Sequence, residues 1–224
     1  NMNSGAPAFG GIEIAIHNAA SNQLFQRYGV PLDNTTAYPN AKMPDYQSAT
    51  EKAFRIMTAG ISGGNTLLFH GSVHGELTHH PLQAILDDDM AGMVGRFMEG
   101  VTVSAESMAL DLIEKVGPVP GHFMSAAHTR KWWKMEQFVP HTADRLTYPE
   151  WQGSGKLTCL DYAQQRLEQI LSSHKPMPLT PAQEDAVERV LEEARTYYYK
   201  KGLITDDEMR AYRDSMKSPN YPFE

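Results

Sequence analysis

The sequence NTLLFHG, residues 65–71, decides the fold. Residues 66–69 are a short apolar run between the turn residues 62–64 and Gly71. Such a run is typical of a strand in a parallel sheet, where both faces are buried. His70 directly follows the predicted strand, so a titratable side chain stands at its carboxyl end.

Helical patterns surround this strand along the chain. Apolar residues recur at helical spacing over residues 12–28, 47–61 and 82–98. Further short strands are predicted over 32–38 and 122–128. Alternating helices and strands predict an α/β fold with a parallel sheet. Three strands are too few for a complete sheet, so we expect a portion of a larger α/β domain.

In the last third of the sequence, capping residues predict the starts of three helices. Thr158 is placed to cap one helix, and Thr180 to Gln183 has the form of a capping box with proline at the first helical position. Thr205 to Glu208 repeats that signal. We expect the α/β portion over 1–157, a helical extension packed on it over 158–217, and a tail over 218–224.

Composition excludes several classes of protein. The 224-residue chain has a formal net charge of -7, whereas a nucleic-acid-binding surface needs a basic stripe. No apolar run approaches the roughly 18 residues of a membrane span, and no signal-peptide pattern opens the chain. The single cysteine, Cys159, excludes an internal disulfide and fits a reducing compartment. We therefore expect a cytoplasmic α/β enzyme.

Candidate site residues follow from the predicted strand ends, because parallel α/β folds bind ligands at the carboxyl edge of the sheet. His70 is the sharpest candidate, as a hydrogen-bond donor, a general base or a metal ligand. It could equally satisfy a neighbouring carbonyl. His74 follows four residues later, but Gly71 and Gly75 make a helix between the histidines unlikely, so the helical zinc signature is not met.

Other polar groups leave two interpretations open. Asp87, Asp88 and Asp89 are predicted near the start of a helix, where acidic side chains favour the macrodipole. One of them could instead join His70 and His74 at a metal. His122 flanks the third predicted strand and is either structural or part of the site.

Several segments, taken in order, resemble the trimethylamine/glycine-betaine:corrinoid methyltransferases. They run through most of the chain: 4–10, 18–21, 27–29, 41–45, 51–53, 65–71, 87–88, 117–123, 128–129 and 174–176. The resemblance implies the C-terminal half of a (β/α)8 TIM barrel with additional C-terminal helices, because family members are about twice as long.

The resemblance also implies an activity. The family moves a methyl group from an amine to the cobalt of a corrinoid held on a separate small protein, with no tightly bound metal expected in the barrel itself. His70 and His74 would be the catalytic residues, orienting a substrate carboxylate or a leaving amine. The substrate would be bound by residues at the strand ends: Tyr38, Phe69, Gly71, His122 and Phe123.

Family members that demethylate trimethylamine carry a pyrrolysine, whereas this sequence shows only standard residues. The resemblance therefore favours the branch that uses quaternary amines such as glycine betaine. Two alternatives stay open: a metal-assisted barrel hydrolase using His70 and His74, and a half-barrel that binds a ligand or partner without turnover. Half a barrel exposes strand edges that invite pairing, so we also expect a homo-oligomer.

Overall fold

The computed structural model describes residues 1–36, 38–68, 71–215 and 217. The chain divides into two compact units, Asn1–Ser173 and His174–Glu224. The predicted boundary at 157/158 precedes a helix that the structure groups with the first unit, in which Ala163 is buried and the helix packs against residues 81–99. None of the described helices is both long and apolar enough to cross a membrane.

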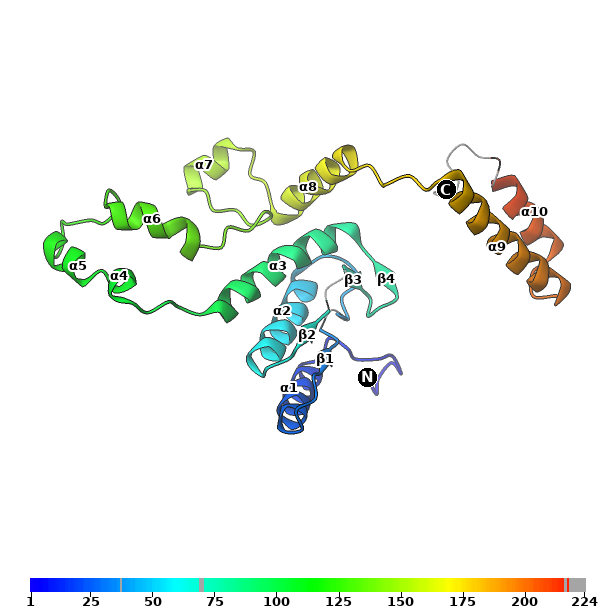
Figure 1. Cartoon of the computed structure of the whole chain (residues 1–224), viewed down its shortest axis with the longest axis horizontal. Helices are drawn as coiled ribbons and strands as arrows, with labels where there is room; N and C mark the ends of the chain where they lie inside the picture. The colour runs from blue at the N-terminus through cyan, green and yellow to red at the C-terminus, as the bar shows by residue number, and fades with distance from the viewer. Residues whose placement is uncertain (37, 69–70, 216, 218–224) are drawn as a thin grey trace. The chain divides into compact units, whose positions relative to one another are not determined.

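The first unit begins with a helix–strand–helix–strand arrangement (Figure 1). Helix α1, Ile12–Arg27, leads to β1, Asp33–Asn34; helix α2, Tyr46–Ile61, then leads to β2, Thr66–Leu67. The two strands are parallel neighbours, with Asp33 opposite Thr66. The predicted parallel pairing is confirmed for these two strands, which are much shorter than expected. Thr66 is exposed, so its strand is not buried on both faces.

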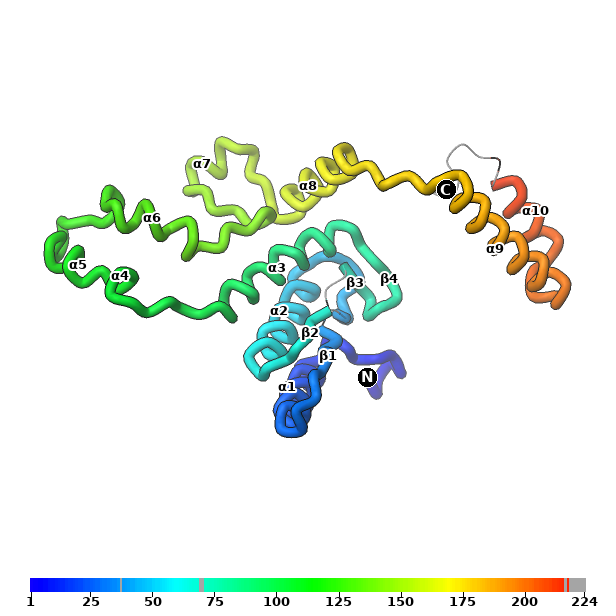
Figure 2. The backbone as a smooth tube through the Cα atoms, viewed as in Figure 1, coloured from blue at the N-terminus to red at the C-terminus, as the bar shows by residue number. Residues whose placement is uncertain are grey.

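A hairpin and a long helix follow, as the backbone trace in Figure 2 shows. Strands β3, Ser72–Val73, and β4, Thr78–His79, pair in antiparallel fashion. Helix α3, Pro81–Glu99, then packs on α2. The small apolar core lies between these helices, with Ile56, Met90 and Val94 buried. Leu67 of β2 packs against this core.

The rest of the first unit is helical and differs from the predictions. The remaining helices are α4 Ala105–Met108, α5 Leu110–Val116, α6 Ala127–Glu136, α7 Tyr148–Gly153 and α8 Cys159–Ser173. The predicted strand over 122–128 is wrong, because this stretch is a turn that runs into α6. Ala109 adopts a left-handed conformation, φ 47°, which separates α4 from α5.

The second unit contains a helical hairpin. Helix α9, Pro181–Lys200, begins with the predicted Thr180/Gln183 capping box, and α10, Asp206–Ser215, follows it. Met209 is buried, and the Arg195 guanidinium lies 3.1 Å from the Tyr212 ring centroid. Both helix starts agree with the sequence prediction, because each depends on side chains within four residues of the start.

Candidate functional site

Helix α2 presents a polar face to the interior. Ser48, Lys52 and Arg55 recur at helical spacing and are all buried, with Lys52 0% and Arg55 2% exposed. Phe54, in contrast, is 58% exposed. Buried charge is costly unless it is paired and hydrogen-bonded, so the partners of these two cations are informative.

Lys52 forms a buried ion pair with Asp87, close to the Gly71 backbone that follows the predicted strand 66–69. Its Nζ donates to Asp87 Oδ2 at 2.6 Å, and the amide of Gly71 donates to the same oxygen at 3.0 Å. The other oxygen of Asp87 accepts from Gln83 Nε2 at 2.7 Å, and Ser48 Oγ donates to Gln83 Oε1 at 2.7 Å. Burial lowers the pKa of Lys52, and the Asp87 carboxylate opposes that shift.

Arg55 serves the end of β1 in a comparable way. Its guanidinium donates to the Tyr38 carbonyl at 2.8 Å and to the Thr35 carbonyl. Burial lowers the pKa of Arg55. The hydroxyl of Thr36 donates to the Leu68 carbonyl at 3.0 Å, which joins the chain after β1 to the chain after β2. Arg55 therefore holds the backbone after β1 directly, and Lys52 is linked to the Gly71 backbone through Asp87.

A cavity of about 160 Å³ opens at this edge, lined in part by Phe9, Lys42, His74 and Glu76. The Phe9 ring lies 5.8 Å from the Tyr38 ring, centroid to centroid, at an interplanar angle of 59°. His74 adopts a left-handed conformation, φ 54°, and its amide donates to the Ala41 carbonyl at 2.6 Å. We call this space the strand-end cavity.

Among the predicted site residues that the structure describes, His74 lines the strand-end cavity, the Tyr38 ring neighbours Phe9 of its wall, and Gly71 directly precedes β3. Gly71 is buried with φ 71°, and a Cβ there would lie 2.8 Å from both Ala84 Cβ and His79 Cε1. Any other residue would be strained at this position and would collide with its neighbours. Phe69 and His70, the centre of the sequence prediction, lie outside the described residues.

His122 and Phe123 are placed differently. Both are exposed in the turn between α5 and α6, and neither lines the strand-end cavity. The Phe123 carbonyl accepts from the amide of Ala126 at 3.0 Å and from Thr129 Oγ1 at 2.7 Å, as in a turn that starts a helix. Their assignment relied on a strand over 122–128 that the structure does not contain.

The aspartates of α3 also differ from expectation. Helix α3 begins at Pro81, so the three carboxylates lie beyond its first turn, and Asp87 and Asp89 are buried. Asp89 accepts from the amides of His141 and Thr142 at 2.8 and 2.6 Å, and from Thr142 Oγ1 at 2.5 Å. Among the described residues, no three His, Cys, Asp or Glu side chains are placed to hold a metal ion.

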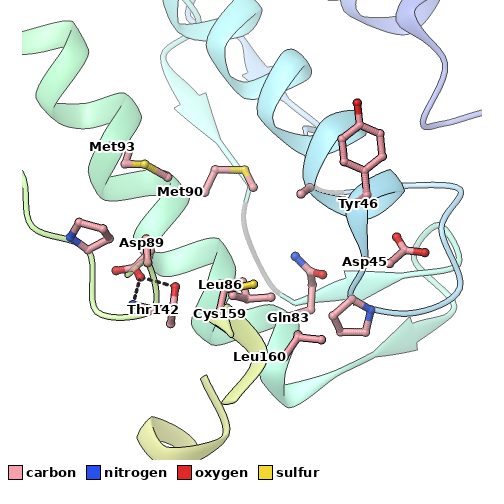
Figure 3. Close-up of a pocket in the computed structure, with 14 residues that line it drawn as sticks. Asp45, Tyr46, Gln83, Leu86, Asp89, Met90, Met93, Thr142, Cys159 and Leu160 are labelled. Atoms are coloured by element: carbon pink, nitrogen blue, oxygen red, sulfur yellow. Dashed lines mark hydrogen bonds between the residues drawn. The ribbon is translucent and has the colours of Figure 1, made fainter. Parts of the chain in front are cut away.

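A second cavity, of about 380 Å³, lies beside Asp89 (Figure 3). Its walls are mostly apolar and include Leu86, Met90 and Met93 of α3 and Leu160 of α8. Asp89 is already hydrogen-bonded to the segment 141–142, so this cavity offers mainly apolar contact. The strand-end cavity, which combines aromatic, cationic, acidic and imidazole groups, is therefore the candidate functional site.

Lys52 and Arg55 were not among the residues expected at the site, and Asp87 was expected there only as a possible metal ligand. One signal was present, because Lys52 and Asp87 both fall within the segments that carry the family resemblance. A second signal was the position of Asp87 on its helix. Asp87 occupies the same face of α3 as Gln83 and Met90, where an apolar residue would be expected.

Comparisons with known proteins point to one family. A family model described as trimethylamine methyltransferase matches residues 1–196. The chain is 36% identical over 182 residues to a glycine betaine methyltransferase of Desulfitobacterium hafniense strain Y51, covering 81% of this chain and 38% of that protein. It is 28% identical over 179 residues to a trimethylamine methyltransferase of Methanosarcina thermophila, covering 80% of this chain and 37% of that protein. The chain thus spans well under half the length of these relatives.

Proposed function

This chain belongs to the trimethylamine methyltransferase family, and on that premise we propose that the protein containing it transfers a methyl group from a methylated amine to a corrinoid carried on a separate protein. The family match over residues 1–196 carries the proposal. It includes every element that builds the strand-end cavity. Because the chain spans 38% of the glycine betaine methyltransferase, the activity is proposed for the full-length protein.

The substrate class that we favour is a quaternary amine such as glycine betaine. The identity is 36% with the glycine betaine methyltransferase and 28% with the trimethylamine methyltransferase of M. thermophila. The sequence shows only standard residues, which fits the branch of the family without pyrrolysine. When a quaternary ammonium loses a methyl group, the electron pair of the broken C–N bond stays on nitrogen. The amine then leaves neutral, and no proton donor is required.

The strand-end cavity has the chemistry to hold such a substrate. Its volume of about 160 Å³ suits a small molecule and excludes a corrin macrocycle, which would approach from outside. The Phe9 ring lines the cavity and would offer a face to a quaternary ammonium, an interaction of about 0.5–2 kcal/mol, and the Tyr38 ring packs beside Phe9. Lys42 and His74 are the groups that would orient a carboxylate at the opposite end of the substrate.

The residues that hold the substrate would set its direction toward the methyl acceptor. Reduced cobalt in the partner's corrinoid would supply the nucleophile. The task of this chain is then positional, because an N-methyl group must point out of the cavity, in line with the attacking atom. His70 and Phe69, which adjoin Gly71, keep their predicted roles in this proposal.

The (β/α)8 barrel is part of the same proposal. The parallel pair β1 and β2, joined through α2, is the repeating unit of such a barrel and supports it. The apolar side chains Ile16, Leu24 and Phe54 are 61%, 49% and 58% exposed, as expected of surfaces that face further polypeptide. The same surfaces support self-association, for which the oligomeric state of the full-length protein is the test.

Methyl transfer to reduced cob(I)alamin tests the function. The full-length protein would be incubated with a panel of tertiary and quaternary amines, and methylation of the cobalt followed by absorbance. We expect methyl transfer from glycine betaine or a related quaternary amine. Failure of every amine, or zinc bound by a protein that hydrolyses its substrate, would overturn the proposal in favour of another barrel enzyme.

Two histidine variants test the site within the same assay. His70→Ala and His74→Ala should each slow transfer by about tenfold or more if they orient the substrate. His141→Ala is the matched control, because this histidine contributes its backbone amide to Asp89 and lies away from the strand-end cavity. Unchanged rates in both site variants would remove the histidines from the mechanism.

A further inference from the structure

The ion pair between Lys52 and Asp87 has no direct access to the candidate substrate. Lys52 is 0% and Asp87 1% exposed, and neither lines the strand-end cavity. An acid or base that touched the reacting atoms would need to reach that space. The pair must therefore act, if it acts in catalysis, through the groups to which it is bonded.

Those bonds lead to the wall of the cavity. The Oδ2 atom of Asp87 accepts from the amide of Gly71, and the Gly71 carbonyl accepts from the amide of His80 at 2.9 Å. Gly71 enters β3 directly, and β3 is held in register by pairing with β4. His74 follows β3 and lines the cavity. A single carboxylate oxygen thus fixes the point from which this wall begins.

Stability alone does not account for a buried ion pair. Replacing such a pair by packed apolar residues is often neutral or stabilising, because the charges lose their hydration. The pair here does what apolar residues cannot do. It supplies a fixed acceptor to a backbone amide at a glycine whose left-handed conformation leaves no room for a side chain.

We propose that Lys52 and Asp87 are positioning residues that hold the backbone from Gly71 to His74 in the geometry the substrate requires. Asp87 orients the Gly71 amide, and Lys52 keeps the Asp87 carboxylate in place. The catalytic part of this inference rests on the proposed methyl transfer, whereas the structural part does not.

Asp87→Asn in the full-length protein is the test. Asparagine has one acceptor oxygen for three donors, namely Lys52 Nζ, the Gly71 amide and Gln83 Nε2. Asp89→Asn is the matched control, since Asp89 is a buried carboxylate of the same helix that bonds to residues 141 and 142 instead. Where Asp87→Asn does not fold, Lys52→Met/Asp87→Asn replaces it, because that variant leaves no unpaired cation.

The first measurement is backbone hydrogen exchange, which does not depend on activity. The Asp87 variant should speed exchange at Gly71 and His80 by about tenfold and leave residues 141–142 unchanged. The Asp89 variant should do the reverse. Equal exchange at Gly71 in the wild type and the Asp87 variant would overturn the structural part of the inference.

The second measurement is the division between kcat and KM for methyl transfer. Misplacement of the wall should lower kcat by about 10- to 100-fold with a smaller change in KM. The Asp89 variant, assayed under conditions in which both variants stay folded, should keep the wild-type kcat. An equal loss of kcat in both variants would show that Lys52 and Asp87 contribute to the stability of the fold and do not position the substrate. A wild-type protein that methylates no corrinoid would instead overturn the proposed function, and the exchange result would still decide the structural part.

Discussion

Asp87 and Asp89 stand two residues apart on α3, equally buried, and are satisfied in different ways. They are 1% and 3% exposed. Asp87 faces a cation, Lys52, whereas the hydrogen bonds to Asp89 come from neutral donors, two amides and a hydroxyl. The first carboxylate accepts from the Gly71 amide, which leads to the wall of the strand-end cavity, and the second lines the cavity of about 380 Å³. The comparison teaches that removing one member of a buried ion pair leaves the other as an unpaired buried charge. Removing one neutral donor from Asp89 should destabilise the protein less.

The largest effect should come from Asp87→Leu. The substitution leaves the Lys52 ammonium buried without its counter-charge, and breaking a buried pair on one side costs about 3–5 kcal/mol. Urea unfolding of the wild type and the variant measures the loss. Lys52→Met/Asp87→Leu should recover most of it, because no unpaired charge remains. A double variant no more stable than the single one would show that Asp87 acts by something other than charge pairing.

Asp89→Asn should have a smaller effect. One oxygen remains for the amides of His141 and Thr142, and the new amide group faces a donor, which costs about 1–3 kcal/mol. Unfolding measured under identical conditions gives the ratio between the two sites. A loss greater than that of Asp87→Leu would reverse the comparison.

Thr142→Val should have a smaller effect still. The change removes one of three donors to Asp89 and preserves the volume of the side chain, so we expect a loss of about 1 kcal/mol. The same unfolding experiment detects it. No loss of stability would mean that the two amides satisfy Asp89 without the hydroxyl.

The pH dependence of stability should show the smallest difference. Burial lowers the pKa of Lys52 in the folded state below its ordinary value of 10.5. Between the lowered pKa and 10.5 the unfolded chain binds more protons than the folded chain, so the contribution of Lys52 to stability rises with pH in that window. Unfolding of the wild type and Lys52→Met over this range should show the rise in the wild type alone. A parallel pH dependence in both proteins would contradict the shift.

The sequence predicted what depends on neighbouring residues. The capping boxes at Thr180 and Thr205 start helices where expected, and α2 and α3 differ from their predicted bounds by one residue at each altered end. The parallel relation of β1 and β2 also followed, because a helix lies between them. The same reasoning assigned Gly71, Tyr38 and His74 to one strand edge as site residues, and that assignment stays a prediction.

The interior faces of the helices could not be predicted in this way. Helical periodicity assigns apolar side chains to the interior of the protein. Helix α2 instead buries Lys52 and Arg55 and exposes Phe54. What reverses the pattern is a partner far along the chain, since Asp87 is 35 residues from Lys52. The strand predicted over 122–128 was also wrong. Its apolar residues suggested a strand, but it contains the start of α6.

The shared oxygen of Asp87 also bears on how the unit folds. One atom accepts from α2 through Lys52 and from the strand end through Gly71, and it belongs to α3. Until all three elements are in place, at least one of these polar groups must keep its water. Partial structures are therefore disfavoured, and the three elements should form and open as one cooperative unit. A polypeptide cut between α2 and α3 would hold half of an ion pair in each piece, and neither piece could bury its own charge.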